Sequence, residues 1–408
     1  MFDSAKDISN LLKKHLNYRE GCLNLIASEN YSSDFVRNQL TSDFNNRYGC
    51  YETCHPENRE YTGNRYIHEF EMATQQLMSD VFKGKYVDLR PVSGHMAGMS
   101  VVLALLEPGD MVVETALSDW GHGLVGPMCQ ISQLDATIQV RYMPFDENRS
   151  VDFEKLKQQV YELKPKLIIF GGSGTIFPEP LAQFRPVADE LGILVAYDAA
   201  HVTGLIAGGT MENPLDVGAD IMFGSTHKSF PGPQGGFVIS NRADLIEKVG
   251  NTLSPSMVTS HHINRLPALA ASLLEMKTFG AAYAQQIVRN TKAFSAALEE
   301  KGFALCGSKR GYSETHVVLM DAGNCEVDMP IAKYLEKAGV LCSDDFSGES
   351  AEVRLGTQEV TRRGMKEEEM PLIADYIKRL LMDKEDIETV REEVEMFSRQ
   401  YVGLEYTF

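Results

Sequence analysis

Residues 223–236 read FGSTHKSFPGPQGG, and this stretch carries the strongest signal for the fold. Lys228 follows a short apolar run and precedes a turn rich in Pro and Gly. A lysine at the end of a buried strand is partly desolvated, which lowers the pKa of such an amine and makes it a nucleophile. Most lysines lie on the surface, so this interpretation depends on the flanking Thr226, His227 and Gly232.

A second apolar run ends in the same way at residues 197–204, YDAAHVTG. Asp198 closes the run and His201 follows three positions later, and a buried acid of this kind needs a cationic partner. Asp198 and Lys228 are 30 residues apart, about one strand–helix–strand unit. The pair fits pyridoxal phosphate, for which a lysine forms the Schiff base and a carboxylate keeps the pyridine nitrogen protonated. The alternative is an ordinary strand-end aspartate that caps a helix.

Residues 90–105, RPVSGHMAGMSVVLAL, have the pattern of a phosphate site. Ser93, Gly94 and His95 open an apolar helix there, and the free backbone N–H groups of a helix start bind anions. Gly94 would allow a phosphate to approach the backbone closely.

Two further residues are candidates for ligand contacts. His122 lies in a turn flanked by glycines, SDWGHGLVGP at 118–127, where an imidazole could stack on a flat ring. Arg354 lies on a short predicted strand in EVRLGTQEVTRRGM, 352–365. Its planar guanidinium suits a carboxylate ligand, and a structural salt bridge is an equal alternative.

The pattern around these segments predicts an α/β fold. Predicted helices at 152–163 and 181–191 separate continuous apolar runs, which is typical of a mostly parallel sheet buried on both faces. The apolar runs lie at 110–117, 166–173, 192–200 and 219–227.

The second half of the chain predicts a smaller α+β unit. A long helical stretch at 264–302 leads to strands near 315–321 and 339–343 and to a helix-rich tail. We therefore expect three parts: an N-terminal arm (1–30), a large cofactor-binding domain (31–277) and a small C-terminal domain (278–408).

Composition narrows the class of protein. The 408 residues carry a net charge of −18, which disfavours a nucleic-acid partner. The N-terminus is charged throughout and no apolar run approaches 18 residues, so we expect neither a signal peptide nor a membrane span. A long chain without a secretion signal predicts a cytoplasmic protein with thiols rather than disulfides. The seven cysteines are Cys22, Cys50, Cys54, Cys129, Cys306, Cys325 and Cys342.

The stretch NNRYGCYETCHPENREYTGN, 45–64, raises the question of a metal or haem site, since Cys50, Cys54 and His55 lie within six residues. A structural zinc needs a fourth ligand at a suitable spacing. Haem attachment usually places two residues between its cysteines, whereas this chain has three. We therefore expect no metal here.

Taken together, the motifs resemble the serine hydroxymethyltransferase family, in its archaeal form, among the fold-type I pyridoxal-phosphate enzymes. The matching segments are spread from residue 23 to residue 369, so the resemblance covers nearly the whole chain. They read LNLIASEN, RPVSGHMAG, YDAAHVTGLIAGG, GSTHKSFPGPQGG and RLGTQEVTRRGMKEEEM.

The resemblance implies roles for individual residues. Lys228 would form the internal aldimine, Asp198 would pair with the pyridine nitrogen, and His122 would stack on the ring. The remaining cofactor contacts implied are Ser93, Gly94, His95, Ser173, His201 and Thr226.

It also implies the substrate side and a homodimer. Arg354 would bind the amino-acid carboxylate with help from Ser28, and Tyr48 and Tyr61 would reach the partner subunit's site. The enzyme would make or break the Cα–Cβ bond of β-hydroxy-α-amino acids through a glycine quinonoid.

The chain departs from the family at 48–61. Family members read like NRYAEGxPGxRYYxG there, and the glutamate expected after the first tyrosine is missing. Cys50 lies near its place, Glu52 is the nearby acid that could substitute as a catalytic group, and Glu60 replaces a tyrosine.

Two functions therefore stay open. The first is hydroxymethyl transfer between serine and glycine with tetrahydrofolate or a methanopterin as co-substrate. The second is an L-threonine transaldolase or aldolase of the same family, which uses a larger aldehyde and no pterin.

Overall fold

The computed structural model describes residue 2, residues 4–126 and residues 138–408, so Cys129 lies outside the described residues. Contacts divide the chain into two compact units. The sheet unit comprises Asn30–Gln285 with Tyr406–Phe408, and the terminal unit comprises Met1–Glu29 with Gln286–Glu405. The domain boundaries expected at 30/31 and 277/278 stay a prediction beside these units.

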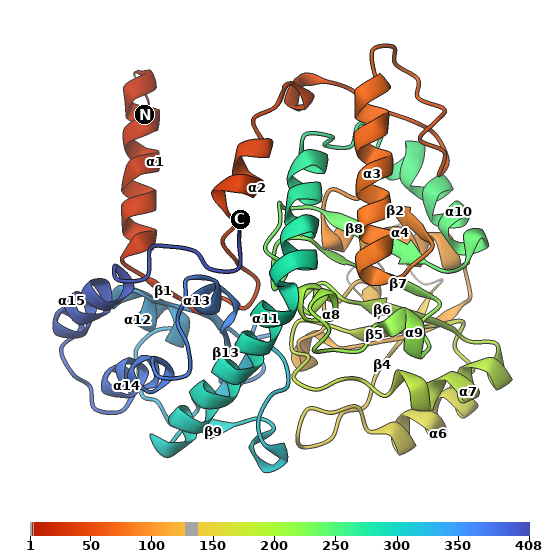
Figure 1. Ribbon diagram of the computed structural model, residues 1–408. Coiled ribbons are helices and arrows are strands. Elements are labelled where there is room, and N and C mark those ends of the chain that lie inside the picture. The colour runs from red at the N-terminus through yellow and green to blue at the C-terminus, as the bar shows by residue number, and fades with distance from the viewer. Residues whose placement is uncertain (1, 3, 127–137) are drawn as a thin grey trace. The chain divides into compact units, whose positions relative to one another are not determined.

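The sheet unit contains a seven-stranded sheet in the order β2-β8-β7-β6-β5-β3-β4 (Figure 1). The strands β4, β3, β5, β6 and β7 pair in parallel, and β8 runs antiparallel to both its neighbours. The strands are β2 (Tyr86–Asp88), β3 (Met111–Glu114), β4 (Gln139–Tyr142), β5 (Leu167–Gly171), β6 (Leu194–Asp198), β7 (Ile221–Ser225) and β8 (Gly236–Ser240).

The sheet unit also contains helices. They are α2 (Asp34–Gln39), α3 (Arg65–Phe82), α4 (Gly94–Leu105), α6 (Phe153–Leu163), α7 (Leu181–Leu191), α8 (Thr203–Ala207), α9 (Pro214–Val217), α10 (Ala243–Thr252) and the first part of α11 (Arg265–Glu300). Short 3-10 turns lie at Asp43–Asn46 and Leu117–Asp119, and a π-type turn at Leu253–Met257.

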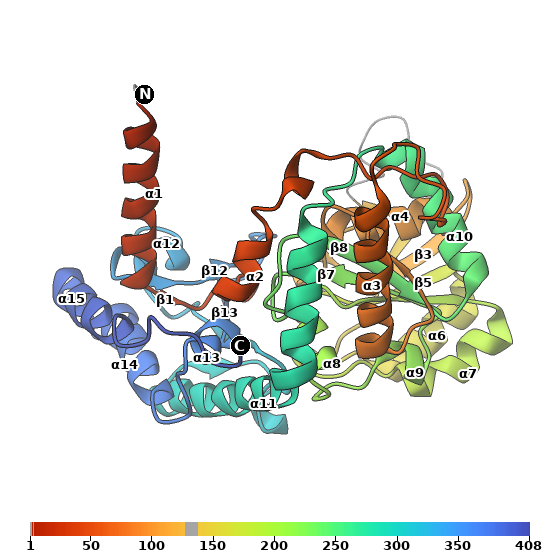
Figure 2. The ribbon, with the colours of Figure 1, turned by 45° about the horizontal axis from the view of Figure 1, so that its top comes forward.

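Alternate residues of the strands pack against different helices. Ile169 and Phe223 belong to one apolar cluster with residues of α4 and α10, two helices that lie side by side in Figure 2. Phe170, the neighbour of Ile169, meets Phe184 of α7 at a ring-centroid distance of 5.4 Å. Both faces of the sheet are therefore buried, which explains the continuous apolar runs in the sequence.

The terminal unit is α+β. Its four-stranded antiparallel sheet has the order β12-β13-β10-β9, and a separate two-stranded sheet pairs β1 with β11. The strands are β1 (Leu23–Asn24), β9 (Ala304–Leu305), β10 (Val317–Asp321), β11 (Val340–Leu341), β12 (Ser343–Asp344) and β13 (Glu352–Gly356). Its helices are α1 (Ala5–Glu20), α12 (Ile331–Lys337), α13 (Gln358–Arg362), α14 (Met370–Leu381), α15 (Ile387–Ser398), the last part of α11 and a 3-10 turn at Ser308–Arg310.

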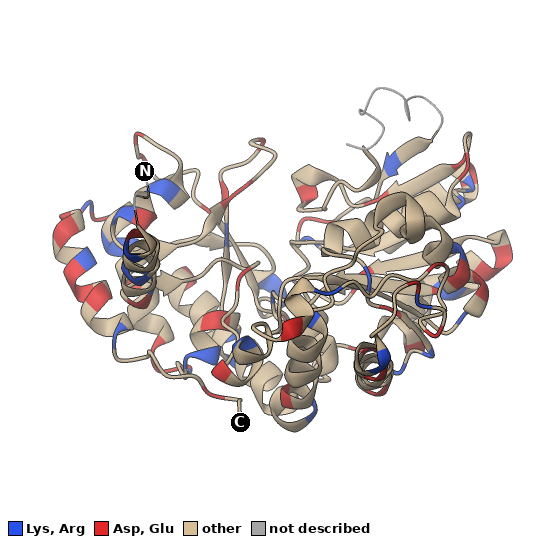
Figure 3. Ribbon diagram, turned by 90° about the horizontal axis from the view of Figure 1, so that it is seen from above, with Lys and Arg blue, Asp and Glu red and all other residues tan. Residues whose placement is uncertain are grey.

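The predicted α/β class, with a mostly parallel sheet and a smaller α+β part, is confirmed. Along the described ribbon, Lys and Arg are interspersed with Asp and Glu (Figure 3). Within the described residues, no helix is both long enough and apolar enough to cross a bilayer.

Candidate active site

Three of the predicted cofactor residues form a connected line in the sheet unit. Lys228 Nζ lies 3.5 Å from His122 Nε2, and His122 Nδ1 lies 2.5 Å from Asp198 Oδ2. Asp198 ends β6 and Lys228 follows β7, which are neighbouring parallel strands. The parallel arrangement therefore brings together two residues that are 30 positions apart, as the sequence predicts.

The electrostatics of this line favour an ionised Asp198. Burial alone would raise the pKa of the Asp198 carboxyl, but the charge and hydrogen bond of His122, and the N–H of Ala200 (3.0 Å from Oδ1), hold this pKa below its ordinary value. The His201 ring lies 5.5 Å from the His122 ring. Desolvation and the positive charge of Lys228 lower the pKa of His227 to about 4, so that His227 is neutral at pH 7.

The backbone around Lys228 is fixed from two directions. Asn30 Nδ2 donates to the Lys228 carbonyl at 2.7 Å and also lies 3.0 Å from the Tyr283 hydroxyl. Ser229 Oγ donates to the His201 carbonyl and accepts from the Gly204 N–H at 3.0 Å, which ties the segment after β7 to the segment after β6. Sequence reasoning missed both residues. Their signal is adjacency, because Ser229 follows Lys228 and Asn30 closes the quoted LNLIASEN.

The start of α4, where the sequence predicts a phosphate site, packs closely against the neighbouring strands. Ser93 caps the helix by accepting a hydrogen bond from the Met96 N–H at 3.1 Å. A Cβ on Gly94 would lie 2.1 Å from Ser225 Oγ, and a Cβ on Gly236 would lie 2.2 Å from the Ser93 carbonyl oxygen. Only glycines therefore allow the helix start to approach the ends of β7 and β8 this closely.

The other predicted cofactor contacts surround this line. Thr226 Oγ1 donates to the Pro233 carbonyl at 2.6 Å and so folds the turn after Lys228. Ser173 donates to the Trp120 carbonyl from both its N–H (2.7 Å) and its hydroxyl (2.9 Å), which fixes the turn two residues before His122. The side chain of His95 is exposed, and desolvation together with His122 lowers its pKa.

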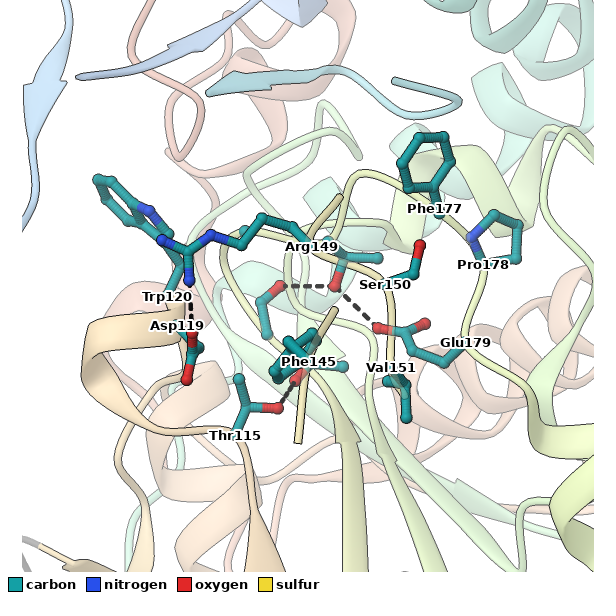
Figure 4. A pocket seen from close by; sticks show the side chains of 14 residues that line it. Thr115, Asp119, Trp120, Phe145, Arg149, Ser150, Val151, Phe177, Pro178 and Glu179 are labelled. Carbon is teal, nitrogen blue, oxygen red and sulfur yellow. Dashed lines mark hydrogen bonds and ion pairs between the residues drawn. The ribbon is translucent and has the colours of Figure 1, made fainter. Parts of the chain in front are cut away.

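A small cavity of about 20 Å³ lies nearby, lined by Trp120, Arg149 and Glu179 among others (Figure 4). Its size suits about one water molecule and excludes an amino acid. The half-buried Glu179 accepts hydrogen bonds from the Tyr197 hydroxyl (2.7 Å) and the Thr175 hydroxyl (3.0 Å). Burial raises the pKa of Glu179, because these donors are neutral.

The stretch from Tyr48 to Tyr61 forms a hairpin in the sheet unit. Tyr51 and Arg59 are bridge partners, and the rings of Tyr48 and Tyr61 stack at its neck with a centroid distance of 5.2 Å. Tyr48 and Tyr61 are 56% and 50% exposed.

The tip of this hairpin carries Glu52, which is exposed, and His55, whose Nδ1 lies 3.1 Å from Glu57. Cys50 is buried and Cys54 is half-buried. In the part of the chain that the structure describes, no group of three or more His, Cys, Asp or Glu is arranged to hold a metal ion.

The predicted carboxylate site lies in the terminal unit. Arg354 is buried on β13, with its guanidinium 5.3 Å from the Phe346 ring and Nη2 3.5 Å from Ser343 Oγ. Burial lowers the pKa of Arg354 to about 10, which leaves it charged at pH 7. Ser28 lies in a turn that packs on the end of this strand, since a Cβ on Gly356 would meet Ala27 Cα at 2.5 Å.

Comparisons with known proteins agree with this geometry. The sequence model of the serine hydroxymethyltransferase family matches residues 1–377. The serine hydroxymethyltransferase of Pyrococcus furiosus is 39% identical over 415 residues, covering 98% of this chain and 96% of that protein. The enzyme of the same name from Saccharolobus solfataricus is 40% identical over 400 residues, covering 96% and 91%.

A solved structure is similar over nearly the whole chain. The crystal structure of L-threonine transaldolase from Pseudomonas fluorescens, in its internal aldimine state, superposes with a TM-score of 0.90 at 29% identity. It covers 99% of this chain and 93% of that one.

The residues fit pyridoxal phosphate, the cofactor implied by these relatives. The free backbone N–H groups at the start of α4 suit an anion such as the phosphate. An ionised, buried carboxylate suits the pyridine nitrogen, and a lysine follows the neighbouring strand. The match across the chain and this arrangement of Lys228, His122 and Asp198 show that the protein is a pyridoxal-phosphate-dependent transferase of fold type I that belongs to the serine hydroxymethyltransferase family.

Proposed function

We propose that the protein transfers a hydroxymethyl group between serine and glycine, with tetrahydrofolate or a methanopterin as the carrier. The observation that supports this most strongly is the line from Lys228 through His122 to Asp198, in a chain that is about 40% identical to serine hydroxymethyltransferases over almost its full length.

The cofactor side of the mechanism is assigned to residues of the sheet unit. Pyridoxal phosphate, when bound, supplies a conjugated ring that withdraws electron density from Cα of an amino acid. We assign Asp198 to hold a proton at the ring nitrogen, because its carboxylate is buried and stays ionised. Lys228 is assigned as the covalent anchor and as the group that moves a proton at Nζ, and His122 as the residue that stacks on the ring.

The phosphate would be held by Ser93, Gly94 and His95 at the start of α4, with Thr226 beside them. Ser173 and His201 are assigned to line the ring. The cap on α4 and the hydrogen bonds of Thr226 and Ser173 hold these turns in place, which supports this assignment.

The substrate side is assigned to the terminal unit and to a second copy of the chain. Arg354 would hold the amino-acid carboxylate with its planar fork, assisted by Ser28. Tyr48, Tyr61 and Glu52 would serve the partner subunit's site in a homodimer, with Tyr61 and Glu52 in acid–base work at the transferred carbon. A cytoplasmic location belongs to the same proposal.

Transaldolase activity is the second candidate function. It is supported by the similarity to the L-threonine transaldolase structure and by the absence of the family glutamate after Tyr48. Such an enzyme would take acetaldehyde from threonine and add a larger aldehyde to the glycine unit, without a pterin.

One experiment separates the two functions. The purified protein is given serine or threonine, each with and without tetrahydrofolate, and formaldehyde or acetaldehyde is measured. We expect serine cleavage to depend on the pterin. Release of acetaldehyde from threonine without a pterin, together with capture of an added aldehyde, would instead establish the transaldolase. The Lys228→Ala variant is the negative control for both activities.

A further inference from the structure

Glu71 is a fully buried carboxylate that none of the assigned roles uses. It lies on α3 and has 0% exposure. Three segments of the sheet unit bind its two oxygens: the Tyr51 hydroxyl donates at 2.7 Å, Arg59 Nη2 donates at 2.5 Å, and His261 Nε2 lies 3.4 Å away. A buried charge is tolerated only with such partners, so Glu71 fixes all three in place.

Arg59 and Tyr51 are the two bridge partners of the hairpin, so Glu71 holds both of its strands. Arg59 Nη1 also donates to the Gly49 carbonyl, next to Tyr48, while the Glu60 N–H donates to the Cys50 carbonyl at 3.1 Å. One guanidinium therefore connects the first strand of the hairpin, the second strand and α3.

The ring of Tyr51 adds a second set of contacts. The guanidinium carbons of Arg90 and Arg59 lie 4.6 Å and 5.2 Å from its centroid. Arg90 Nη1 donates to the Tyr51 carbonyl at 3.2 Å and Arg90 Nη2 is paired with Asp88 at 2.6 Å. The base of the hairpin is thus bound to β2 as well as to α3.

The neck of this anchored hairpin carries the stacked Tyr48 and Tyr61. Tyr48 also lines a polar hollow of about 450 Å³, together with Ser260, His261 and His262. His261 is the third partner of Glu71. The same carboxylate therefore holds two walls of the hollow, one through Arg59 and Tyr51 and the other through His261.

We propose that Glu71 and Arg59 are positioning residues, which hold the Tyr48–Tyr61 pair in the pose that the partner subunit's active site needs. This inference rests on the proposed function, in which those tyrosines act in the neighbouring subunit. Without the anchor, the neck keeps its stacking contact but loses the bonds that fix its direction, and small displacements of a catalytic group reduce turnover strongly.

The test uses heterodimers in which one chain carries Lys228→Ala and the other Arg59→Met. As a homodimer, Arg59→Met is expected to lose about 30-fold in kcat, with KM for the amino acid within about twofold and the visible spectrum of the bound cofactor unchanged. In the purified heterodimer, one of the two sites combines an intact Lys228 with an intact hairpin, so about half of the wild-type activity should return. No recovery would overturn the proposal, because Arg59 would then act within its own chain.

Control variants separate this result from a failure of the proposed function. Tyr61→Phe paired with Lys228→Ala must also recover activity if sites are shared, and its failure would count against shared sites rather than against the anchor. Arg65 is an exposed arginine of α3, the helix that carries Glu71, and Arg65→Met should leave kcat unchanged. If Arg59→Met does not fold, Tyr51→Phe takes its place, because this variant removes only the hydroxyl that donates to Glu71.

The kcat lost in the Tyr51→Phe homodimer should return in the heterodimer with Lys228→Ala. If it does not return, the proposed role of Glu71 and Arg59 is overturned.

Discussion

The strand-end site and the hairpin of residues 48–61 are both organised around a buried carboxylate, but they are built differently. Asp198, at the end of β6, takes its partner His122 from the turn after β3, which lies two strands away in the sheet, and Lys228 follows the adjacent parallel strand β7. Glu71 gathers Tyr51, Arg59 and His261, which span more than 200 positions of the chain.

This difference explains why the strand-end site can be predicted from the sequence and the contacts of the hairpin cannot. At the strand ends, the sheet geometry is fixed by the apolar runs, and the chemical residue follows each run directly. In the hairpin, the contacts come from Glu71 on α3, 12 and 20 positions from Arg59 and Tyr51, and from His261, 190 positions from Glu71, and no strand end marks either residue. The predictions below test this contrast, from the largest expected effect to the smallest.

Lys228→Ala should abolish turnover, with a loss of at least ~10³-fold in kcat, because no other group of the site can replace the covalent anchor. The loss is measured with serine cleavage and with the visible absorption of the purified protein. Lys248→Ala, an exposed lysine of α10, is the matched control and should behave as the wild type. Retained turnover in Lys228→Ala would remove the strand-end site from the mechanism.

Asp198→Asn should reduce kcat by about 10²-fold to 10³-fold, since a neutral amide cannot hold a proton at the ring nitrogen. Glu179→Gln is the comparison, because Glu179 is a half-buried carboxylate that accepts hydrogen bonds from the neutral hydroxyls of Tyr197 and Thr175. It should keep kcat within about fivefold. Equal losses in the two variants would show that the charge of Asp198 has no special role in turnover.

Glu71 predicts a pH-dependent stability of the hairpin region. Burial would raise its pKa, yet His261 and Arg59 lower it from 4.5 to about 2. A folded-state pKa below the unfolded one gives stability that is present above about pH 4.5 and is lost as the pH falls toward 2, amounting to roughly 3 kcal/mol. When the pH is lowered from 6 to 3, the melting temperature should therefore fall more steeply in the wild type than in Glu71→Gln. If the melting temperatures of the two proteins fall in parallel, Glu71 is not an ionised carboxylate that stabilises the fold.

Gly94→Ala should weaken cofactor binding by about tenfold, because the added methyl would lie 2.1 Å from Ser225 Oγ and displace the start of α4. The affinity is measured by titrating the apo-protein with pyridoxal phosphate. Gly403→Ala, where nothing lies within 4 Å of the added Cβ, is the control and should bind normally. Unchanged affinity in Gly94→Ala would show that the close packing of α4 on Ser225 is not needed for cofactor binding.

Glu52→Gln should have the smallest effect, about fivefold in kcat, because an exposed carboxylate at a hairpin tip contributes less than the 10²-fold or more of a well-positioned acid or base. The measurement compares serine and threonine cleavage in the same preparation. A loss above ~10²-fold with serine alone would show that Glu52 has taken over the role of the missing family glutamate.

Much of the fold could be predicted from local pattern. The helix expected at 181–191 is α7 at Leu181–Leu191, and the stretch at 264–302 contains α11 at Arg265–Glu300. The antiparallel β8, Gly236–Ser240, was not predicted, since its register is set by pairing with β7 and β2. Short strands of this kind owe their existence to neighbours rather than to their own residues.

One feature of the sequence does indicate that Glu71 has a buried partner. Glu71 lies on the buried face of α3 with Ile67, Thr74 and Met78, at positions where an amphipathic helix normally carries apolar side chains. A charge at such a position indicates a buried partner, but the identity of that partner is not contained in the helix.

The sequence by itself determined the parallel sheet, the glycine at the start of α4 and the neighbouring strand ends that carry Asp198 and Lys228, because each follows from residues adjacent to a strand or helix end. The tertiary structure alone decided how the hairpin is held. In the sequence its cysteines and His55 only raise the question of a metal site, whereas in the structure Tyr51 and Arg59 bind the carboxylate of Glu71 on α3. Hydrogen bonds between distant segments depend on distances that only the folded chain sets, so no local pattern could have specified them.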